Sequence, residues 1–515
     1  MKRFLFIFIV FTLISINASC APYHSNDFDP NPYDDLITCS EDRNQAKCSD
    51  PDLWEWRINR TDFDGKGMTI KLLHGAPEEL DPNLSYFRGE RKGSKEYRLY
   101  EIEEAYNISL SIEKYPAEAA WGNKRISWIN DLENSYGHIF AISSSWIPQL
   151  AEKESIAVLE NVVYNQETSL WEQSKGHFTN FNFNAPQDLL SNNYNNKVYG
   201  YSVEEEHADH FLYYNQELID KYNLEDPATL WNENKWDWTT FCNFLETAQK
   251  AFDENRENTD PKMYAFGGNE EYVLKGILAS EGGKLVDLEN RQVLLYSEQL
   301  FEIIERLKPI KNSKLWSNDT GELCEEFLKG NQLFQPGELW YISSKTKFNV
   351  SYINKPIYKP TVSVVPYPTK DGDAVTKSLY KIPSKQKDTY VIRDVINGEN
   401  GLTTKVLFNL LDDFFNCINP EFVTYNLTKE EIYRTFLTER IKSNASVDAI
   451  MSIEKNLEKY LYIEYIDEVQ NYLKEDEYSS GYYWAKGLLN EGSRTNFVLG
   501  NHQERYQNAL NELIG

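Results

Sequence analysis

The segment Glu204–Asp220, EEEHADHFLYYNQELID, holds the densest group of side chains that could do chemistry. Carboxylates and imidazoles this close together are typical of metal ligands, of catalytic acids and bases, and of polar groups that bind a ligand. If residues 206–213 are extended, side chains alternate between two faces, and His207 and His210 point apart. The two imidazoles could then not coordinate the same metal ion. The pattern disfavours a metal site and leaves ligand contacts and structural side chains as alternatives.

The second half of this segment predicts a strand that leads into a helix. The run Phe211–Asn215, FLYYN, is aromatic and apolar, which favours an extended structure. Asn215 is a good N-cap for the residues that follow, and Glu217 in the first turn suits the helix dipole. Asn223 stands where a left-handed residue would end the helix.

The elements before this segment alternate between strands and helices. We expect strands at Met68–Gly75, Ile108–Pro116 and His138–Trp146, with a helix around Arg125–Leu132. This alternation predicts βαβ units and a mostly parallel sheet, hence an α/β fold. Ligands of such sheets lie beyond the carboxyl ends of the strands, where Trp146 is expected.

The elements after it are mainly helical. Apolar residues recur at helical spacing within Trp236–Phe252, behind Thr residues that could cap the helix. A further helix and a Gly-Gly hairpin are expected within Val273–Asp287, and another helix at Ser297–Ile310. Ser363–Pro368, SVVPYP, reads as extended. Residues beyond about 400 are again mainly helical, and no internal repeat is found.

Length and charge exclude some classes of function. A chain of 515 residues is too long for one ordinary core and predicts two or more domains. The formal charge is −27 and no run of Lys or Arg stands out. Binding to a phosphate backbone requires concentrated positive charge, so we expect no nucleic-acid partner.

The N-terminus predicts export. Two basic residues precede an apolar core, and Cys20 follows at the position of a bacterial lipoprotein cysteine, which is acylated after cleavage. Ordinary cleavage after Ala21 is the alternative. We expect residues 1–20 to be a lipoprotein signal peptide and 21–65 a polar tether. Removing the two basic residues leaves 51 basic against 80 acidic residues, a charge of −29, and no later segment is apolar enough to cross a bilayer.

The other cysteines give no metal or redox motif, because no CxxC pair occurs. Cys39 and Cys48 could form a local disulfide outside the cytoplasm. Cys242, Cys324 and Cys417 are far apart in the sequence, and we expect them to be buried single thiols.

Several short motifs occur in a specific order between about residues 66 and 400. They are HIFAISSSWIPQLAEKESIAVL, KVYGYSVEEEHADHFLYYNQELIDKYNLEDPATLW, WDWTTF, YAFGG, EGGKLVD, FLKGNQLFQPGELW and SVVPYP. Together with the lipoprotein-like signal, this order resembles the extracellular solute-binding proteins of ABC importers, in particular the sugar- and oligosaccharide-binding family.

The resemblance implies a two-lobed, periplasmic-binding-protein-like α/β fold with the ligand between the lobes. The chain would cross the hinge more than once, first just before FLYYN and again near SVVPYP. The N-terminal lobe would comprise 66–205 with about 366–420, and the C-terminal lobe 206–365. Residues 421–515, which match the family poorly, would form a helical region that packs on the lobes.

The resemblance also implies the site. The family's G–x–x–W element, here Gly337 to Trp340, places an aromatic ring against the ligand, so Trp340 is the principal candidate and Trp146 the next. The further candidates are Glu206, His207, Asp209, Tyr272, Tyr341 and Trp121. The acid-rich hinge and Asn223, where the family usually has Gly, depart from the pattern, and the acids raise the question whether the ligand is cationic.

The sequence contains no catalytic motif that argues against a binding function. GxSxG, HExxH, the P-loop and GxGxxG are absent, and SxxK strings such as Ser344–Lys347 and Ser384–Lys387 are at chance level. We therefore expect a monomeric, lipid-anchored, non-enzymatic protein without cofactor or metal. It would bind a sugar or oligosaccharide and deliver it to ABC permease subunits. The alternatives are a secreted carbohydrate-active hydrolase, a surface adhesin, and a binding protein for a cationic or peptide ligand.

Overall fold

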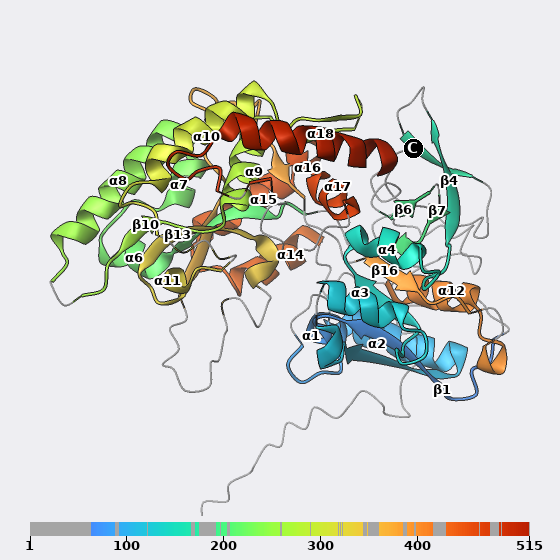
Figure 1. The fold of residues 1–515 in the computed structure, drawn as a ribbon. Helices are drawn as coiled ribbons and strands as arrows, with labels where there is room; N and C mark the ends of the chain where they lie inside the picture. Colours follow the sequence, from blue (N-terminus) through green and yellow to red (C-terminus); the bar gives the residue numbers. More distant parts are fainter. Residues whose placement is uncertain are drawn as a thin grey trace, which may run out of the picture.

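A computed structural model gives the fold (Figure 1). It describes residues 63–87, 92–120, 122–165, 170–174, 192–195, 197–202, 207–257, 260–288, 290–317, 319, 321, 323–342, 348, 360–384, 389–395, 398–415, 429–462, 464–473, 484–485 and 487–513. The expected signal peptide, the tether up to residue 62, and the possible Cys39–Cys48 disulfide lie outside these residues, as does Cys417.

The first lobe is built on a sheet with the strand order β2-β1-β3-β16-β8. β1 pairs in parallel with β2 and β3, as the alternation of strands and helices predicts, whereas β16 runs antiparallel to both β3 and β8. β16 is the strand with which the chain returns from the second lobe, and β8 is the last strand before the chain leaves for that lobe. The sheet strands are β1 (Met68–His74), β2 (Ile108–Lys114), β3 (Ile139–Ile142), β8 (Gly200–Tyr201) and β16 (Thr389–Ile392).

Helices cover both faces of this sheet, and a smaller sheet of order β5-β4-β7-β6 lies beside it. The helical elements are α1 (Pro77–Leu80), α2 (Lys92–Tyr106), η3 (Ala117–Ala119), α3 (Gly122–Asn130), η4 (Ser144–Trp146), α4 (Ile147–Ala151), η6 (Glu399–Gly401) and α12 (Thr404–Phe415). The small-sheet strands are β4 (Glu160–Asn165), β5 (Leu170–Ser174), β6 (Asn193–Tyr194) and β7 (Lys197–Val198).

The second lobe is built on a sheet with the order β10-β13-β9-β14. β9 is central and antiparallel to both β13 and β14, and all six of its residues are buried because both faces of the sheet are covered. The strands are β9 (His210–Asn215), β10 (Tyr264–Phe266), β13 (Gln332–Glu338) and β14 (Val362–Val365), with a hairpin of β11 (Val286–Asp287) and β12 (Gln292–Val293). The helices are α6 (Gln216–Lys221), α7 (Pro227–Asn232), α8 (Trp238–Glu254), α9 (Glu270–Ser280), α10 (Glu298–Lys311), α11 (Glu325–Leu328) and the 3-10 turn η5 (Leu339–Ile342).

The local signals around β9 are confirmed. The Asn215 side chain accepts a hydrogen bond from the Glu217 N–H at 3.0 Å and caps α6, and Asn223 has a φ of 51°, in the left-handed region. The cap of α8 is Asp237 rather than a Thr, because its carboxylate accepts from the Thr240 N–H. The Gly-Gly pair ends α9, where Gly282 has a φ of 78°, instead of turning a hairpin.

The chain passes three times between the two sheets. The first passage lies between β8 and β9, the second between β14 and β16, and the third between α12 and α14. On the second passage the segment 366–383 stays beside the second lobe, since the Thr369 N–H binds the Trp236 carbonyl and the Lys381 N–H binds the Ala279 carbonyl.

The C-terminal region adds one strand and several helices, which confirms its helical character. It consists of α14 (Lys429–Thr438), α15 (Asn444–Glu454), α16 (Leu457–Tyr460), β17 (Leu461–Tyr462), α17 (Ile466–Tyr472) and α18 (Thr495–Leu513). α15 packs on α7 and β14, and α18 packs on β12 and α17. Buried residues such as Ile450 and Tyr506 belong to the same hydrophobic core as the second sheet.

Candidate functional site

The two sheets direct corresponding edges toward the junction between the lobes. In the first sheet β1, β2 and β3 are parallel, and Ile142 at the end of β3 pairs with Thr389 at the start of β16. In the second sheet Glu338, which ends β13, pairs with His210, which begins β9. Because the chain passes between lobes at these edges, the strand ends of the two sheets lie on either side of the hinge, and strand ends of this kind are where open α/β sheets bind ligands.

A three-stranded arrangement forms the hinge. Ala208 makes an antiparallel bridge to Ser384, and β15 (Ile382–Pro383) pairs in parallel with β17. The Asp209 N–H donates to the Pro383 carbonyl at 3.0 Å, and the Ser384 N–H donates to the Tyr462 carbonyl at 2.8 Å. The C-terminal region therefore contributes one strand of the hinge.

On the first lobe, Trp146 is a buried support rather than an exposed platform. It lies in η4, directly after β3, and only 5% of its surface is exposed. The Arg125 guanidinium lies 3.9 Å from the Tyr115 ring centroid and 5.6 Å from that of Trp146. Arg125 also donates to the Ala119 carbonyl at 3.2 Å, which fixes the loop before α3.

On the second lobe, the Gly337–Trp340 element sets two aromatic rings at the sheet edge. A Cβ on Gly337 would lie 2.8 Å from the Tyr341 ring and 2.9 Å from the Tyr213 ring, so the close approach requires glycine. Tyr341 is fully buried and stacks on Tyr213 with an interplanar angle of 6°. Trp340 is only partly buried, meets Tyr341 edge to face, and donates its Nε1–H to the Glu338 carboxylate.

The predicted hinge residues are held by internal contacts. His207 Nδ1 lies 2.9 Å from Glu454 Oε2, and its ring stacks on Tyr433 with centroids 4.5 Å apart. Asp209 is 1% exposed and its Oδ1 accepts from the Leu339 N–H at 2.7 Å. Both residues tie the hinge strand to neighbouring elements. Glu206 and Trp121, like Cys20, lie outside the described residues.

His210 and Lys275 are prominent polar residues of this edge that were not among the predicted ligand contacts. His210 packs edge to face on Tyr272, with centroids 5.7 Å apart. Burial, helped by the charge of Lys275, lowers the pKa of His210 to about 3, so its imidazole is neutral at physiological pH. The strand periodicity placed His210 on the other face of the strand from His207, but it did not predict that His210 would pack against α9.

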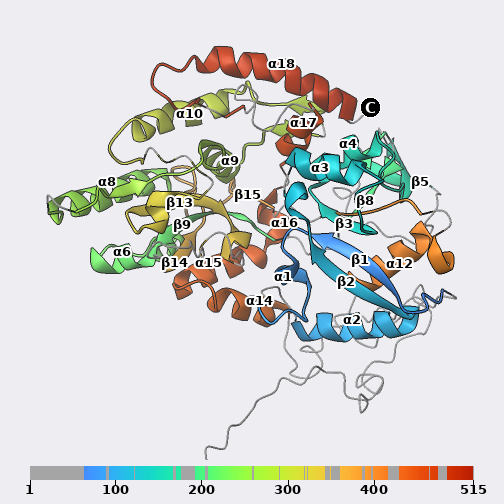
Figure 2. The ribbon, with the colours of Figure 1, turned by 60° about the horizontal axis from the view of Figure 1, so that its bottom comes forward.

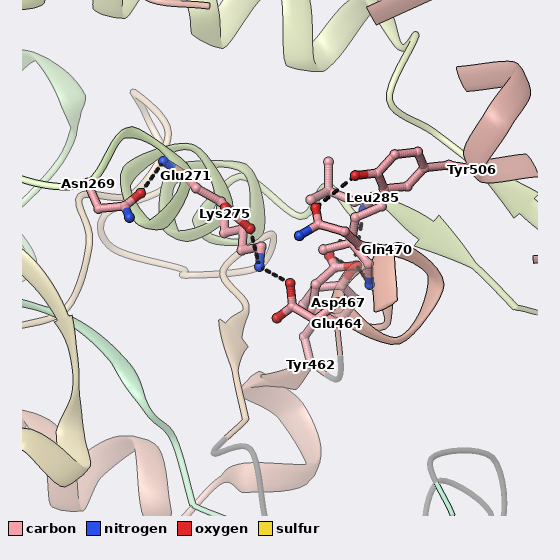
Figure 3. A network of polar contacts seen from close by, with 10 residues as sticks. Asn269, Glu271, Lys275, Leu285, Tyr462, Glu464, Asp467, Gln470 and Tyr506 are labelled. Carbon is pink, nitrogen blue, oxygen red and sulfur yellow. Dashed lines mark hydrogen bonds and ion pairs between the residues drawn. The ribbon is translucent and has the colours of Figure 1, made fainter. Parts of the chain in front are cut away.

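Lys275 is the centre of a buried polar network that joins α9 to the C-terminal region (Figure 3). Its ammonium is 5% exposed and lies 2.8 Å from Glu271 and 2.7 Å from Asp467 of α17. Burial opposes the charge of Lys275, but the two carboxylates more than offset this and raise its pKa. The network thus fixes the start of α17 against the second lobe.

Around Lys275, further contacts extend the same junction. Glu464 accepts from the Leu285 N–H at 3.2 Å and from the Tyr462 hydroxyl, and burial raises the pKa of its carboxyl to about 7. Tyr506 on α18 donates to Gln470 on α17 at 2.7 Å (Figure 3). The other side of α17 approaches η4, so α17 lies between the two lobes, as both ribbon views show (Figures 1 and 2).

The structure brings together only part of the predicted site. The turn η5 brings together Trp340, Tyr341 and Asp209. Tyr272 packs against His210. Trp146 belongs to the opposite lobe, and His207 faces the C-terminal helices. Within the described ranges, no cluster of three or more His, Cys, Asp and Glu residues could hold a metal ion, and no helix has the length and apolarity to cross a membrane.

Comparisons with known proteins identify the fold. No protein-family model matches the sequence, and neither does any curated protein. Among solved structures, UgpB from Mycobacterium tuberculosis in complex with glycerophosphocholine is similar, with a TM-score of 0.51 at 12% identity over 87% of this chain and 99% of the other. The ABC substrate-binding protein Lmo0181 from Listeria monocytogenes in complex with cycloalternan gives 0.49 at 13% over 86% and 99%. The expected two-lobed, periplasmic-binding-protein-like fold is therefore confirmed.

Proposed function

We propose that the protein is an extracytoplasmic substrate-binding protein of an ABC transporter, which binds a carbohydrate between its lobes and delivers it to a membrane permease. The observation that carries this proposal is the geometry of the two sheets. Their strand ends lie on either side of a hinge that the chain crosses three times. Folds of this kind close around a solute, and the similarity to UgpB supports the same use here.

The residues at the junction suit a sugar. Trp340 keeps part of its indole accessible beside the strand edge, and apolar sugar faces stack on such rings. Its indole is oriented by the hydrogen bond to Glu338 and by the edge contact with Tyr341. A preorganised ring loses little conformational entropy when a ligand binds.

A cationic or peptide ligand is the second candidate. The formal charge of −27 favours it, as do the three acids Glu204–Glu206 that precede the hinge residues in the sequence. UgpB was solved with glycerophosphocholine, whose choline group carries a positive charge. Against it, Asp209, Glu338 and Glu454 each already accept a hydrogen bond from a group of the protein.

A ligand screen tests the function. Calorimetry and thermal shift against mono- and oligosaccharides, amines and short peptides should find a saccharide that binds and is recovered unchanged. Steady hydrolysis of a bound glycoside, abolished by replacing one carboxylate, would refute the non-enzymatic proposal and favour the hydrolase. Binding confined to amines or peptides would favour the second candidate.

We further propose that Cys20 carries the lipid anchor and that the protein works as a monomer at the outer face of the membrane. The basic start, apolar core and cysteine of the N-terminus support this. The wild-type chain expressed in a bacterium should partition with membranes, whereas Cys20→Ser should be released into the soluble extracytoplasmic fraction. Continued membrane association of Cys20→Ser would contradict the anchor.

A further inference from the structure

His210 is a buried polar side chain with an unsatisfied atom. It is 9% exposed, and its Nδ1 has no hydrogen-bond partner within the part of the chain that the structure describes. A buried imidazole nitrogen left without a partner costs on the order of 1–3 kcal/mol. Native proteins rarely keep such a group unless water or a ligand satisfies it.

The position of His210 distinguishes it from a comparable residue. His502 on α18 also has a buried Nδ1 without a partner in the described ranges, and it also packs edge to face on a tyrosine, Tyr506. However, His502 lies on α18, an outer helix, whereas His210 begins β9 directly after the hinge bridge of Ala208 to Ser384. Of these two histidines, His210 is the one that lies where a ligand held between the lobes would contact the second sheet.

The charged groups around His210 are paired with opposite charges or accept hydrogen bonds. On α9, Lys275 pairs with Glu271 and with Asp467 of α17, and Glu270 pairs with Lys311 at 3.3 Å.

On the strands that meet His210, the Glu338 carboxylate accepts a hydrogen bond from Trp340, and the Asp209 carboxylate accepts one from Leu339. Glu464, near Lys275, accepts from Tyr462 and Leu285. Beside these groups, Nδ1 of the neutral His210 imidazole is an atom that a ligand could still hydrogen-bond.

We propose that His210 is a specificity-determining residue that hydrogen-bonds an uncharged hydroxyl or amide group of the ligand, with Tyr272 flanking it. The inference rests on the proposed function and specifies it, because it predicts a neutral hydroxyl or amide group at this point of the ligand. α17, which is held by Lys275 and approaches η4, lies beside this position and makes the C-terminal region part of the junction where the ligand is bound.

The test uses the full-length chain and four disaccharides. Maltose, cellobiose and N,N′-diacetylchitobiose are neutral, and chitobiose has the skeleton of the acetylated sugar with two amines in place of the amides. Calorimetry compares wild type with His210→Phe, His210→Asn and the control His502→Phe. Asn places a polar atom close to the position of Nδ1, whereas Phe keeps only the ring.

We expect at least one neutral disaccharide to bind, His210→Phe to weaken it about ten-fold, and His210→Asn to recover most of the loss, since one hydrogen bond is at stake. His502→Phe should bind as wild type does. In 15N-histidine-labelled wild type, the same sugar should shift the ring-nitrogen resonance that is missing from His210→Asn. This second measurement tests the role of His210 even if His210→Phe does not fold.

The possible failures are distinguishable. If a disaccharide binds and His210→Phe matches wild type, with no histidine resonance shifted, the role of His210 is refuted while the proposed function stands. If chitobiose binds and its acetylated form does not, the neutral-ligand inference is refuted. If no carbohydrate binds in the wider screen either, the proposed function and this inference both fail.

Discussion

Single residues at the junction divide into those that hold the structure and those that remain accessible. Tyr341 and Trp340 are neighbours in sequence, yet the first is fully buried against Tyr213 and the second keeps part of its ring exposed. The acids near them accept internal hydrogen bonds, with Asp209 bound to the Leu339 N–H. The residue type alone does not distinguish a structural side chain from an accessible one, because the role depends on which neighbouring residues pack against it.

Substitution of the two neighbouring aromatics should separate binding from stability. We expect Trp340→Ala to weaken saccharide binding about ten-fold, because an indole that stacks on a sugar is lost. Tyr341→Ala should instead lower the free energy of unfolding by about 3–5 kcal/mol, because it leaves a cavity against Tyr213. Calorimetry and urea denaturation measure the two effects. Unchanged affinity in Trp340→Ala would show that the ligand lies elsewhere.

The titration of one carboxyl gives a pH-dependent signal. Burial raises the pKa of Glu464 from 4.5 to about 7, so the folded state holds this proton more tightly than the unfolded state. Its contribution to stability is therefore present below about pH 4.5 and is lost as the pH rises to about 7. Between pH 5 and 8, wild type should lose more stability than Glu464→Gln, as thermal unfolding of both proteins measures. Parallel pH profiles would contradict this assignment.

At the level of elements, helix α9 is positioned by a close contact with the segment that follows β14. Gly276 lies inside α9, and a Cβ there would come within 2.2 Å of the Tyr367 ring. Tyr367 is 1% exposed and donates its hydroxyl proton to the Tyr272 carbonyl at 3.0 Å. The glycine thus lets α9 approach closely enough to place Tyr272 and Lys275.

Two glycine substitutions test this contact. Alanine normally stabilises a helix interior by about 1 kcal/mol relative to glycine. Gly500→Ala in α18 should show this gain, because its Cβ would meet only Tyr296 at an ordinary 3.7 Å. Gly276→Ala should instead destabilise the protein by about 1–3 kcal/mol through overpacking. Urea denaturation compares the two, and a stabilised Gly276→Ala would mean that α9 and Tyr367 separate easily.

At the scale of the whole molecule, the C-terminal region connects the lobes. β17 joins the hinge beside β15, α17 is held to α9 by Lys275, and its far side approaches η4. Opening and closing of the lobes would therefore have to accommodate α17. The lobe boundaries expected from the sequence stay a prediction, and the contacts of residues 366–383 with α8 and α9 bear on where the return to the first lobe begins.

Removing the central cation should loosen this region. Lys275→Met removes the counter-charge of Glu271, which is largely buried, and of Asp467, whose side chain is 41% exposed. We expect the free energy of unfolding to fall by about 3 kcal/mol, because only one of these two carboxylates is largely buried. Limited proteolysis should cut the C-terminal region faster than in wild type. Lys250→Met, which breaks an exposed pair with Glu254, is the control and should change stability by less than about 1 kcal/mol. Equal effects of both substitutions would argue against a special role for Lys275.

The local order of the chain could be predicted from the sequence. β1, β2, the strand–cap–helix transition at Asn215 and the apolar face of α8 all follow from short-range patterns, whereas the Gly337–Trp340 element was expected from the family resemblance. The features that follow from short-range patterns depend on periodicity and capping, which act over a few residues. The order of these motifs also indicated the two-lobed fold.

Only the tertiary structure decided which candidate side chains are exposed and what the C-terminal region contacts. His207 meets Glu454 and Lys275 meets Asp467, pairs separated by 247 and 192 residues along the chain. The burial of Trp146 likewise results from elements that only the fold brings together, as does the position of His210 Nδ1, which has no hydrogen-bond partner among the described residues. Local patterns specify how a segment folds, whereas the exposure and charge of a site depend on what packs against it.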